Sequence, residues 1–275
     1  MGNVNKSAPV GIFDSGLGGL TVVREVLSEL PDEDIVYFGD TARVPYGSKS
    51  RDTIVHYTKQ ILAFLKTKDV KAIVVACNTA SAYALEEVQE SVPVPIVGVV
   101  KPGALVAAKE TKNGRIGVIG TRGTVRSGLY RKCLLEYRPD AEVFQKACPL
   151  FVPLVEEGLW EDELTRIAAE RYLQELKDAG VDTLIMGCTH YPLIRPVIRE
   201  IMGGEVRLIN PAHETAKRMR EILEEKHLCR DPLGEPSKTP YRFFVSDDPE
   251  SFRDFASKIL NFHLPMPEKI EIEGY

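Results

Sequence analysis

The chain has 275 residues, 44% of them hydrophobic and 27% charged, which is ordinary for a soluble protein with one large domain or two smaller ones. Its net charge of −5 argues against a general binder of nucleic-acid backbones, which needs a basic surface. No apolar run is long enough to span a membrane, and the first residues lack the apolar stretch of a signal peptide. We therefore expect a cytoplasmic protein with no nucleic-acid or membrane partner.

Short, continuously apolar runs recur along the chain, as expected of strands covered on both faces of a parallel sheet. In chain order, strands are predicted at Val10–Asp14, Ile35–Phe38, Ala72–Ala76, Pro95–Val100, Arg115–Gly120, Val181–Met186, Arg207–Ile209 and Tyr241–Val245. Helices are predicted at Leu20–Leu30, Arg51–Lys66, Ser81–Val88, Gly103–Lys109, Arg126–Tyr137, Glu161–Ala179, Arg195–Met202, Glu214–His227 and Glu250–Leu260. This alternation predicts an α/β fold with mainly parallel sheets.

Two pairs of similar segments indicate that the chain has two related halves. Val10–Gly16 resembles Ile116–Arg122, and the surroundings of Cys77 resemble those of Cys188 at nearly the same separation. We therefore expect two pseudo-symmetric α/β domains of normal size. Residues 98–210 form the second domain in this interpretation. Residues 1–97 form the first together with residues 211–275, whose helix–strand–helix pattern fits a return to it.

Cys77 and Cys188 are the most informative residues of the sequence. Each follows a predicted strand and precedes a polar pair and a helix-like segment, so both fall where α/β sheets bind their ligands. A thiol at a helix N-terminus gains thiolate character, because the exposed N–H groups favour an anion. Two such thiols suit a reaction that removes a proton from one face of a carbon atom and returns one to the other face. The remaining cysteines, Cys133, Cys148 and Cys229, are expected to be free, buried and inert.

Neighbouring polar residues suggest how the thiols could be assisted. Asp14 and His190 are candidates to hold and polarise them, although Asp14 could instead cap a turn and His190 could be a satisfied polar residue at a helix start. The glycine-rich segment Asp14–Gly19 offers N–H groups to a small anion such as a carboxylate, but it lacks a nucleotide-binding signature. No residues are spaced for a zinc site, and a single nucleophilic cysteine would leave the second one unexplained.

Four motifs together resemble the glutamate racemases of the aspartate/glutamate racemase superfamily: Phe13–Val22, Phe38–Gly47, Ala76–Ser81 and Gly187–Pro192. The resemblance implies a homodimer of two-domain chains that bind glutamate in the cleft between the domains. It also implies a reaction that needs no cofactor and no metal and that supplies D-glutamate for peptidoglycan and the cell wall. His190 stands where aspartate-specific relatives tend to carry glutamate, which favours glutamate as the substrate.

The same resemblance assigns roles to individual residues. Cys77 is implied to deprotonate D-glutamate and Cys188 L-glutamate, with Asp14, Glu156 and His190 assisting; from the residues alone, Glu156 is ambiguous, because exposed acids are common. The positions implied to bind the substrate are Asp14, Ser15, Pro45, Tyr46, Gly47, Ser48, Asn78, Thr79, Thr121 and Thr189. Two other functions stay open on this scaffold: a cysteine-dependent amidase or transferase, and an amino-acid sensor that binds without catalysis.

Overall fold

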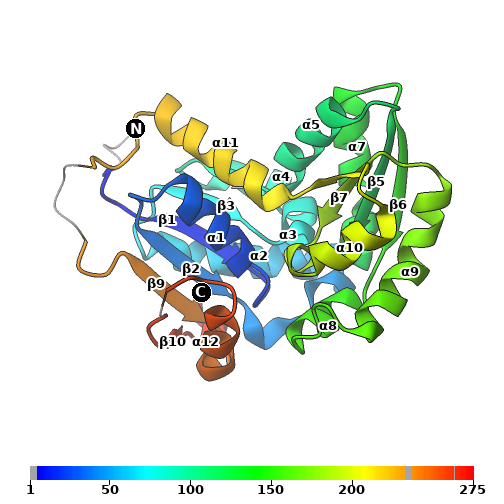
Figure 1. The fold of residues 1–275 in the computed structure, drawn as a ribbon. Helices are drawn as coiled ribbons and strands as arrows, with labels where there is room; N and C mark the ends of the chain where they lie inside the picture. Colours follow the sequence, from blue (N-terminus) through cyan, green and yellow to red (C-terminus); the bar gives the residue numbers. More distant parts are fainter. Residues whose placement is uncertain (1–4, 233–236, 263) are drawn as a thin grey trace.

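The computed structural model describes residues 5–232, 237–262 and 264–275. Its strands form two sheets in which every paired strand is parallel, as the alternating pattern predicts. Figure 1 shows the two sheets side by side, with helices packed around each of them. The α/β fold with mainly parallel sheets is therefore confirmed.

The first sheet has six strands in the order β10-β9-β2-β1-β3-β4. Their bounds are β1 Val10–Asp14, β2 Ile35–Gly39, β3 Ala72–Val75, β4 Ile96–Gly98, β9 Tyr241–Val245 and β10 Glu268–Lys269. Strands β1, β2 and β3 are buried along their whole length, which explains their continuously apolar sequences. Strand β9 pairs with β2, so the last part of the chain adds its strands to the first sheet.

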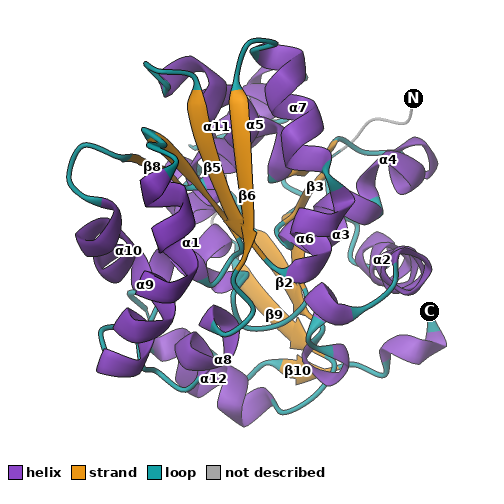
Figure 2. Ribbon diagram, turned by 90° about the vertical axis from the view of Figure 1, so that its right-hand side faces the viewer, coloured by secondary structure: helices purple, strands orange, loops and turns teal. Residues whose placement is uncertain are grey.

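The second sheet has four strands in the order β6-β5-β7-β8. Their bounds are β5 Arg115–Gly120, β6 Glu142–Ala147, β7 Thr183–Gly187 and β8 Arg207–Ile209. Figure 2 shows these strands above those of the first sheet, with the ends of the two groups meeting in the middle of the molecule. The predicted domain boundaries, 1–97 with 211–275 and 98–210, remain a prediction.

The helices lie in the connections between the strands. Their bounds are α1 Leu20–Glu29, α2 Arg51–Lys66, α3 Asn78–Tyr83, α4 Leu85–Val88, α5 Val100–Glu110, α6 Arg122–Ser127, α7 Leu129–Tyr137, α8 Phe151–Glu156, α9 Glu163–Asp178, α10 Arg195–Met202, α11 Pro211–Glu225 and α12 Pro249–Ser257. Helix α11 packs against both α1 and α5, and so touches the layers of both sheets (Figure 1). No helix in the described part of the chain is both long and apolar enough to cross a membrane.

Several helices begin where the sequence provides a cap. The side chain of Ser50 accepts a hydrogen bond from the N–H of Thr53 and starts α2, and Asp162 does the same for Leu164 at the start of α9. Asn210 caps α11, whose first residue is Pro211. These local signals explain why the long helices were predictable.

The sequence-based prediction missed three elements and merged two pairs of helices, one of them being the predicted helix Ser81–Val88, which is α3 and α4 and begins at Asn78. Strand β6 is half-exposed at a sheet edge, so it lacks a continuously apolar run, and β10 and α8 are too short for a periodic signal. The predicted helix Arg126–Tyr137 is two helices, because Gly128 adopts a φ of +68° between α6 and α7. The loop predicted from Cys229 to Pro240 lies partly outside the described residues.

Candidate active site

Cys77 follows the end of strand β3 and is the N-cap residue of helix α3. Its Sγ accepts a hydrogen bond of 3.5 Å from the backbone N–H of Ala80, and only 5% of the residue is exposed. Burial and the nearby charge of Asp14 raise the pKa of this thiol to about 12, although hydrogen bonds from Ala80 and Ser15 act in the opposite direction. The expected gain in thiolate character is therefore wrong for Cys77 here, because desolvation outweighs the helix N-terminus.

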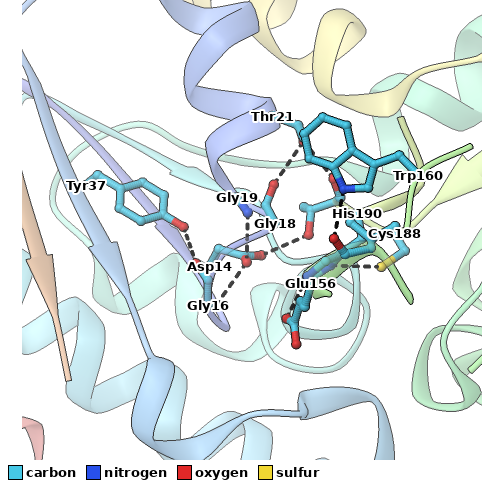
Figure 3. A network of polar contacts seen from close by, with 12 residues as sticks. Asp14, Gly16, Gly18, Gly19, Thr21, Tyr37, Glu156, Trp160, Cys188 and His190 are labelled. Carbon is cyan, nitrogen blue, oxygen red and sulfur yellow. Dashed lines mark hydrogen bonds and ion pairs between the residues drawn. The ribbon is translucent and has the colours of Figure 1, made fainter. Parts of the chain in front are cut away.

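Cys188 occupies the matching position in the second sheet, directly after strand β7. Its Sγ lies 3.7 Å from Nδ1 of His190, and the other ring nitrogen, Nε2, lies 2.9 Å from Oε1 of Glu156 (Figure 3). Burial alone would lower the pKa of His190, but its contacts with Cys188 and Glu156 raise it to about 10. The imidazole is thus protonated at neutral pH and stands between a thiol and a carboxylate.

Asp14 is buried at the end of β1, and its carboxylate holds the glycine-rich loop. Oδ2 accepts hydrogen bonds of 3.0 Å from the N–H groups of Gly16 and Gly19, as Figure 3 shows. Burial raises the pKa of Asp14, although the positive charge of His190 and the loop N–H groups lower it. Oδ1 lies 3.5 Å from the Thr189 hydroxyl. Asp14 therefore caps the turn of its own loop and also lies beside Thr189 in the second half of the chain.

The glycine-rich loop of the first half lies directly against the segment that follows Cys188. A Cβ atom added to Gly18 would come within 2.4 Å of Oγ1 of Thr189 and 2.5 Å of Nδ1 of His190. Only a residue without a side chain allows this approach. The hydroxyl of Thr21 also donates a hydrogen bond of 2.8 Å to the carbonyl oxygen of Thr189. The two halves are thus joined next to one of the two cysteines.

A second junction lies beside Cys77. The hydroxyl groups of Thr79 and Thr121 are 2.9 Å apart, and Thr121 caps helix α6 of the second half. A Cβ atom on Gly47 would lie 2.5 Å from Cβ of Thr121, so the segment Pro45–Ser48 packs against this threonine. Within that segment Pro45 and Ser48 are exposed, whereas Tyr46 is buried. The Tyr46 hydroxyl donates a hydrogen bond to Asp40, so its side chain is committed to holding the segment in place.

Predicted site residues from the two halves of the chain thus lie together, where the ends of the strands of the two sheets meet. Asn78 and Thr189, which follow the two cysteines, are both buried, and Ser15 is half-buried between Asp14 and the glycines. A small cavity of about 10 Å³, room for one water molecule, is lined by Asn78, Cys188 and Thr189 among others. In the described residues no group of three or more His, Cys, Asp or Glu side chains could hold a metal ion.

The other cysteines lie away from this junction or differ in their environment. Cys133 and Cys148 are buried, and burial raises the pKa of both thiols, while Cys229 is partly exposed. Cys133 lines a larger cavity of about 560 Å³ between α5, α7 and α11. That cavity contains neither Cys77 nor Cys188, so its size does not make it the candidate active site.

Sequence reasoning missed some residues that shape the site. Tyr37 and Tyr130 are fully buried, and their hydroxyl groups donate hydrogen bonds to the carbonyl oxygen of Gly16 and to Oδ1 of Asn78. Tyr37 stands in an apolar strand and Tyr130 on an apolar helix face, where a tyrosine is typical of the core. Only their hydrogen bonds in the folded chain distinguish these two tyrosines from ordinary core residues.

Comparison with known proteins gives this arrangement a family. Residues 18–219 match the family model described as Asp/Glu/Hydantoin racemase. The chain belongs to this family. It is 50% identical to the glutamate racemase of Geobacter metallireducens over 96% of this chain and 97% of that relative. The resemblance to glutamate racemases that the sequence motifs carry is thereby confirmed.

Solved structures agree with this membership of the racemase family. The glutamate racemase isoform RacE1 from Bacillus anthracis superposes with a TM-score of 0.92 at 39% identity, covering 97% of this chain and 98% of that one. The glutamate racemase of Francisella tularensis, solved in complex with D-glutamate, gives a TM-score of 0.90 at 38% identity, covering 98% and 100%. The two-sheet architecture of this chain is therefore that of the family.

Proposed function

We propose that this chain interconverts L- and D-glutamate by a two-base proton transfer that uses Cys77 and Cys188 and needs no cofactor. The observation that carries the proposal is the matched placement of the two thiols. Each lies within two residues of the end of a strand, in different sheets, and contacts between the halves lie beside both. The many glutamate racemases among the relatives support glutamate as the substrate.

The proposed chemistry divides between the two sulfur atoms. One thiolate removes the proton from Cα of glutamate, and the opposite thiol donates a proton to the other face, which inverts the centre. The raised pKa of Cys77 favours its protonated form, which is the form needed to donate a proton when L-glutamate is converted; in the reverse direction Cys77 must first lose that proton. The charged imidazole of His190, 3.7 Å from Cys188, offsets the negative charge of a thiolate there. By resemblance, Cys77 deprotonates D-glutamate and Cys188 deprotonates L-glutamate.

The substrate is proposed to lie between the two halves. Ser15, Asn78, Thr79, Thr121 and Thr189 offer hydroxyl and amide groups there, and the segment Pro45–Ser48 lies beside Thr121. Asp14 belongs to both the catalytic and the binding set, because it faces Thr189 and acts on the pKa of Cys77. Since both cysteines are at least 94% buried, we propose that the halves separate to admit glutamate.

The biological setting follows from the proposed product. D-glutamate made by this reaction supplies peptidoglycan synthesis and thus the cell wall, and we propose that the enzyme acts in the cytoplasm, where free thiols such as these stay reduced. A homodimer is proposed from the resemblance to the family. Light scattering of the purified protein tests the dimer directly.

Exchange in heavy water tests the reaction. With no cofactor added, either enantiomer of glutamate should acquire deuterium at Cα while optical rotation decays to zero. Binding of glutamate without exchange would instead identify an amino-acid sensor. A covalent acyl group trapped on one cysteine, detected by mass spectrometry, would identify the amidase or transferase.

A further inference from the structure

Tyr130, on helix α7, contacts the residue next to each of the two cysteines. Its hydroxyl donates a hydrogen bond of 2.7 Å to Oδ1 of Asn78, the residue after Cys77. Its ring lies against Gly187, the residue before Cys188, since a Cβ atom there would be 3.1 Å from Cε2 of the ring. The side chain is completely buried, so one tyrosine links the surroundings of both thiols.

The hydrogen bond from Tyr130 determines how the Asn78 amide can be used. An asparagine amide has one acceptor oxygen and one donor nitrogen. Because the tyrosine hydroxyl donates to the oxygen, it fixes the orientation of the amide and leaves both N–H groups free to face a ligand. Asn78 follows Cys77, lines the small cavity beside Cys188 and belongs to the residues proposed to bind glutamate. An N–H donor suits a carboxylate, of which glutamate carries two.

The tyrosine is suited to hold this orientation. Burial raises the pKa of Tyr130 well above its usual range, and nearby Cys133 and Cys188 raise it further, so the hydroxyl remains a donor at any working pH. The same added Cβ on Gly187 would also lie 2.7 Å from the carbonyl oxygen of Ile119 in the neighbouring strand β5. The ring therefore packs against a strand end where even a Cβ atom would not fit.

We propose that Tyr130 is a positioning residue that turns the Asn78 amide nitrogen toward a carboxylate of the substrate and holds Gly187, and with it Cys188, in place opposite Cys77. This inference rests on the proposed racemisation of glutamate. It assigns the hydroxyl to substrate binding through Asn78, and the ring to the placement of Cys188.

The variant Tyr130→Phe separates these two contributions, because it keeps the ring and removes the hydroxyl. We expect KM to rise about tenfold for both enantiomers while kcat changes much less, since the lost contact orients a donor to a charged group. Tyr130→Leu also removes the ring and should lower kcat in addition. Thr111→Val is the matched control, because it deletes a buried hydroxyl that donates to Asp182, at the opposite end of β7 from Cys188. It should leave KM unchanged.

A double-mutant cycle with Asn78→Ala tests whether Tyr130 acts on substrate binding through Asn78. In that background Tyr130→Phe should have no further effect on KM, because the amide it orients is gone. The same cycle measured as affinity for D-glutamate by calorimetry needs no turnover, so it stays decisive for binding even if the wild-type chain fails to racemise glutamate. An unchanged affinity in Tyr130→Phe, or an equal loss with and without Asn78, overturns the inference.

Discussion

The hydroxyl of Thr21, in the first turn of helix α1, donates a hydrogen bond of 2.8 Å to the carbonyl oxygen of Thr189 in the other half of the chain. Both residues are buried, so the bond is shielded from water. It fixes the glycine-rich loop of the first half against the segment that follows Cys188. The contact therefore links the placement of Asp14 to that of His190.

The variant Thr21→Val tests this contact. It keeps the shape of the side chain but leaves the buried Thr189 carbonyl without a partner, which costs about 1–3 kcal/mol of unfolding free energy. We also expect a loss of kcat, because the residues on both sides of the contact move apart. Urea unfolding and steady-state kinetics measure the two effects. Thr111→Val, which deletes a buried hydroxyl that donates to Asp182 at the opposite end of β7 from Cys188, should lose stability without losing kcat.

The two cysteines are the subject of a second prediction. Cys77→Ser and Cys188→Ser should each reduce racemisation at least about 100-fold, because a serine hydroxyl is a much weaker acid than a thiol and replaces one of two required proton carriers. Circular dichroism at neutral pH follows the loss of optical activity, and thermal unfolding checks that the fold survives. Cys133→Ser, which alters a buried thiol outside the junction, should be nearly silent. Near-normal turnover in either active-site variant would contradict the two-base mechanism.

Much of the fold could be predicted because its signals are local. The buried strands β1, β2 and β3 carry uninterrupted apolar runs, and the helix α11 has an asparagine cap followed by proline. The half-exposed edge strand β6 and the two-residue strand β10 lack such signals. These two strands lie at the edges of their sheets, where an apolar run is not required, so the sequence did not predict them.

The sequence predicted which residues belong to the candidate site, but not how those residues contact one another. Both cysteines and His190 stand at strand ends, where the sequence already points to a ligand site. The contacts of Tyr130 with Asn78 and Gly187 depend on how the two halves pack, which no local pattern contains. The raised pKa of Cys77 was also missed, because desolvation depends on burial by residues far apart in the sequence.

The raised pKa of His190 predicts how stability depends on pH. Its pKa is about 10 in the folded chain and 6.5 ordinarily, so protonation stabilises the fold fully below pH 6.5, and this contribution disappears as the pH rises toward 10. The difference in unfolding free energy between the wild type and His190→Gln should therefore shrink steadily between pH 6.5 and pH 10. Urea unfolding at several pH values measures it, and a pH-independent difference would contradict the assignment.

The carboxylate of Glu156 is expected to maintain that protonation. Glu156→Gln keeps an acceptor oxygen near Nε2 of His190 but removes the negative charge, so His190 should titrate at a lower pH than in the wild type. NMR of the labelled imidazole follows the titration. The neighbouring Glu157 is exposed and provides the control, because Glu157→Gln should leave the titration of His190 unchanged.

A buried ion pair at the opposite end of the first sheet leads to the last prediction. Lys71, just before strand β3, pairs with Glu33, and its Nζ also donates a hydrogen bond of 2.6 Å to the carbonyl oxygen of Lys6. Oε1 of Glu33 accepts a further hydrogen bond of 2.9 Å from the N–H of Arg230. The pair thus joins four separate segments, and both of its own side chains are buried.

Removing only the lysine should be more harmful than neutralising both partners. Lys71→Met leaves the Glu33 carboxylate buried without its counter-charge, which costs about 3–5 kcal/mol of unfolding free energy. Adding Glu33→Gln removes that charge and keeps the acceptor for Arg230, so the double variant should regain much of the loss. Cys77 lies beyond the other end of β3, so KM and kcat of the folded variants should match the wild type. Equal stability of the single and double variants, measured by urea unfolding, would show that Glu33 is not held as a charged group.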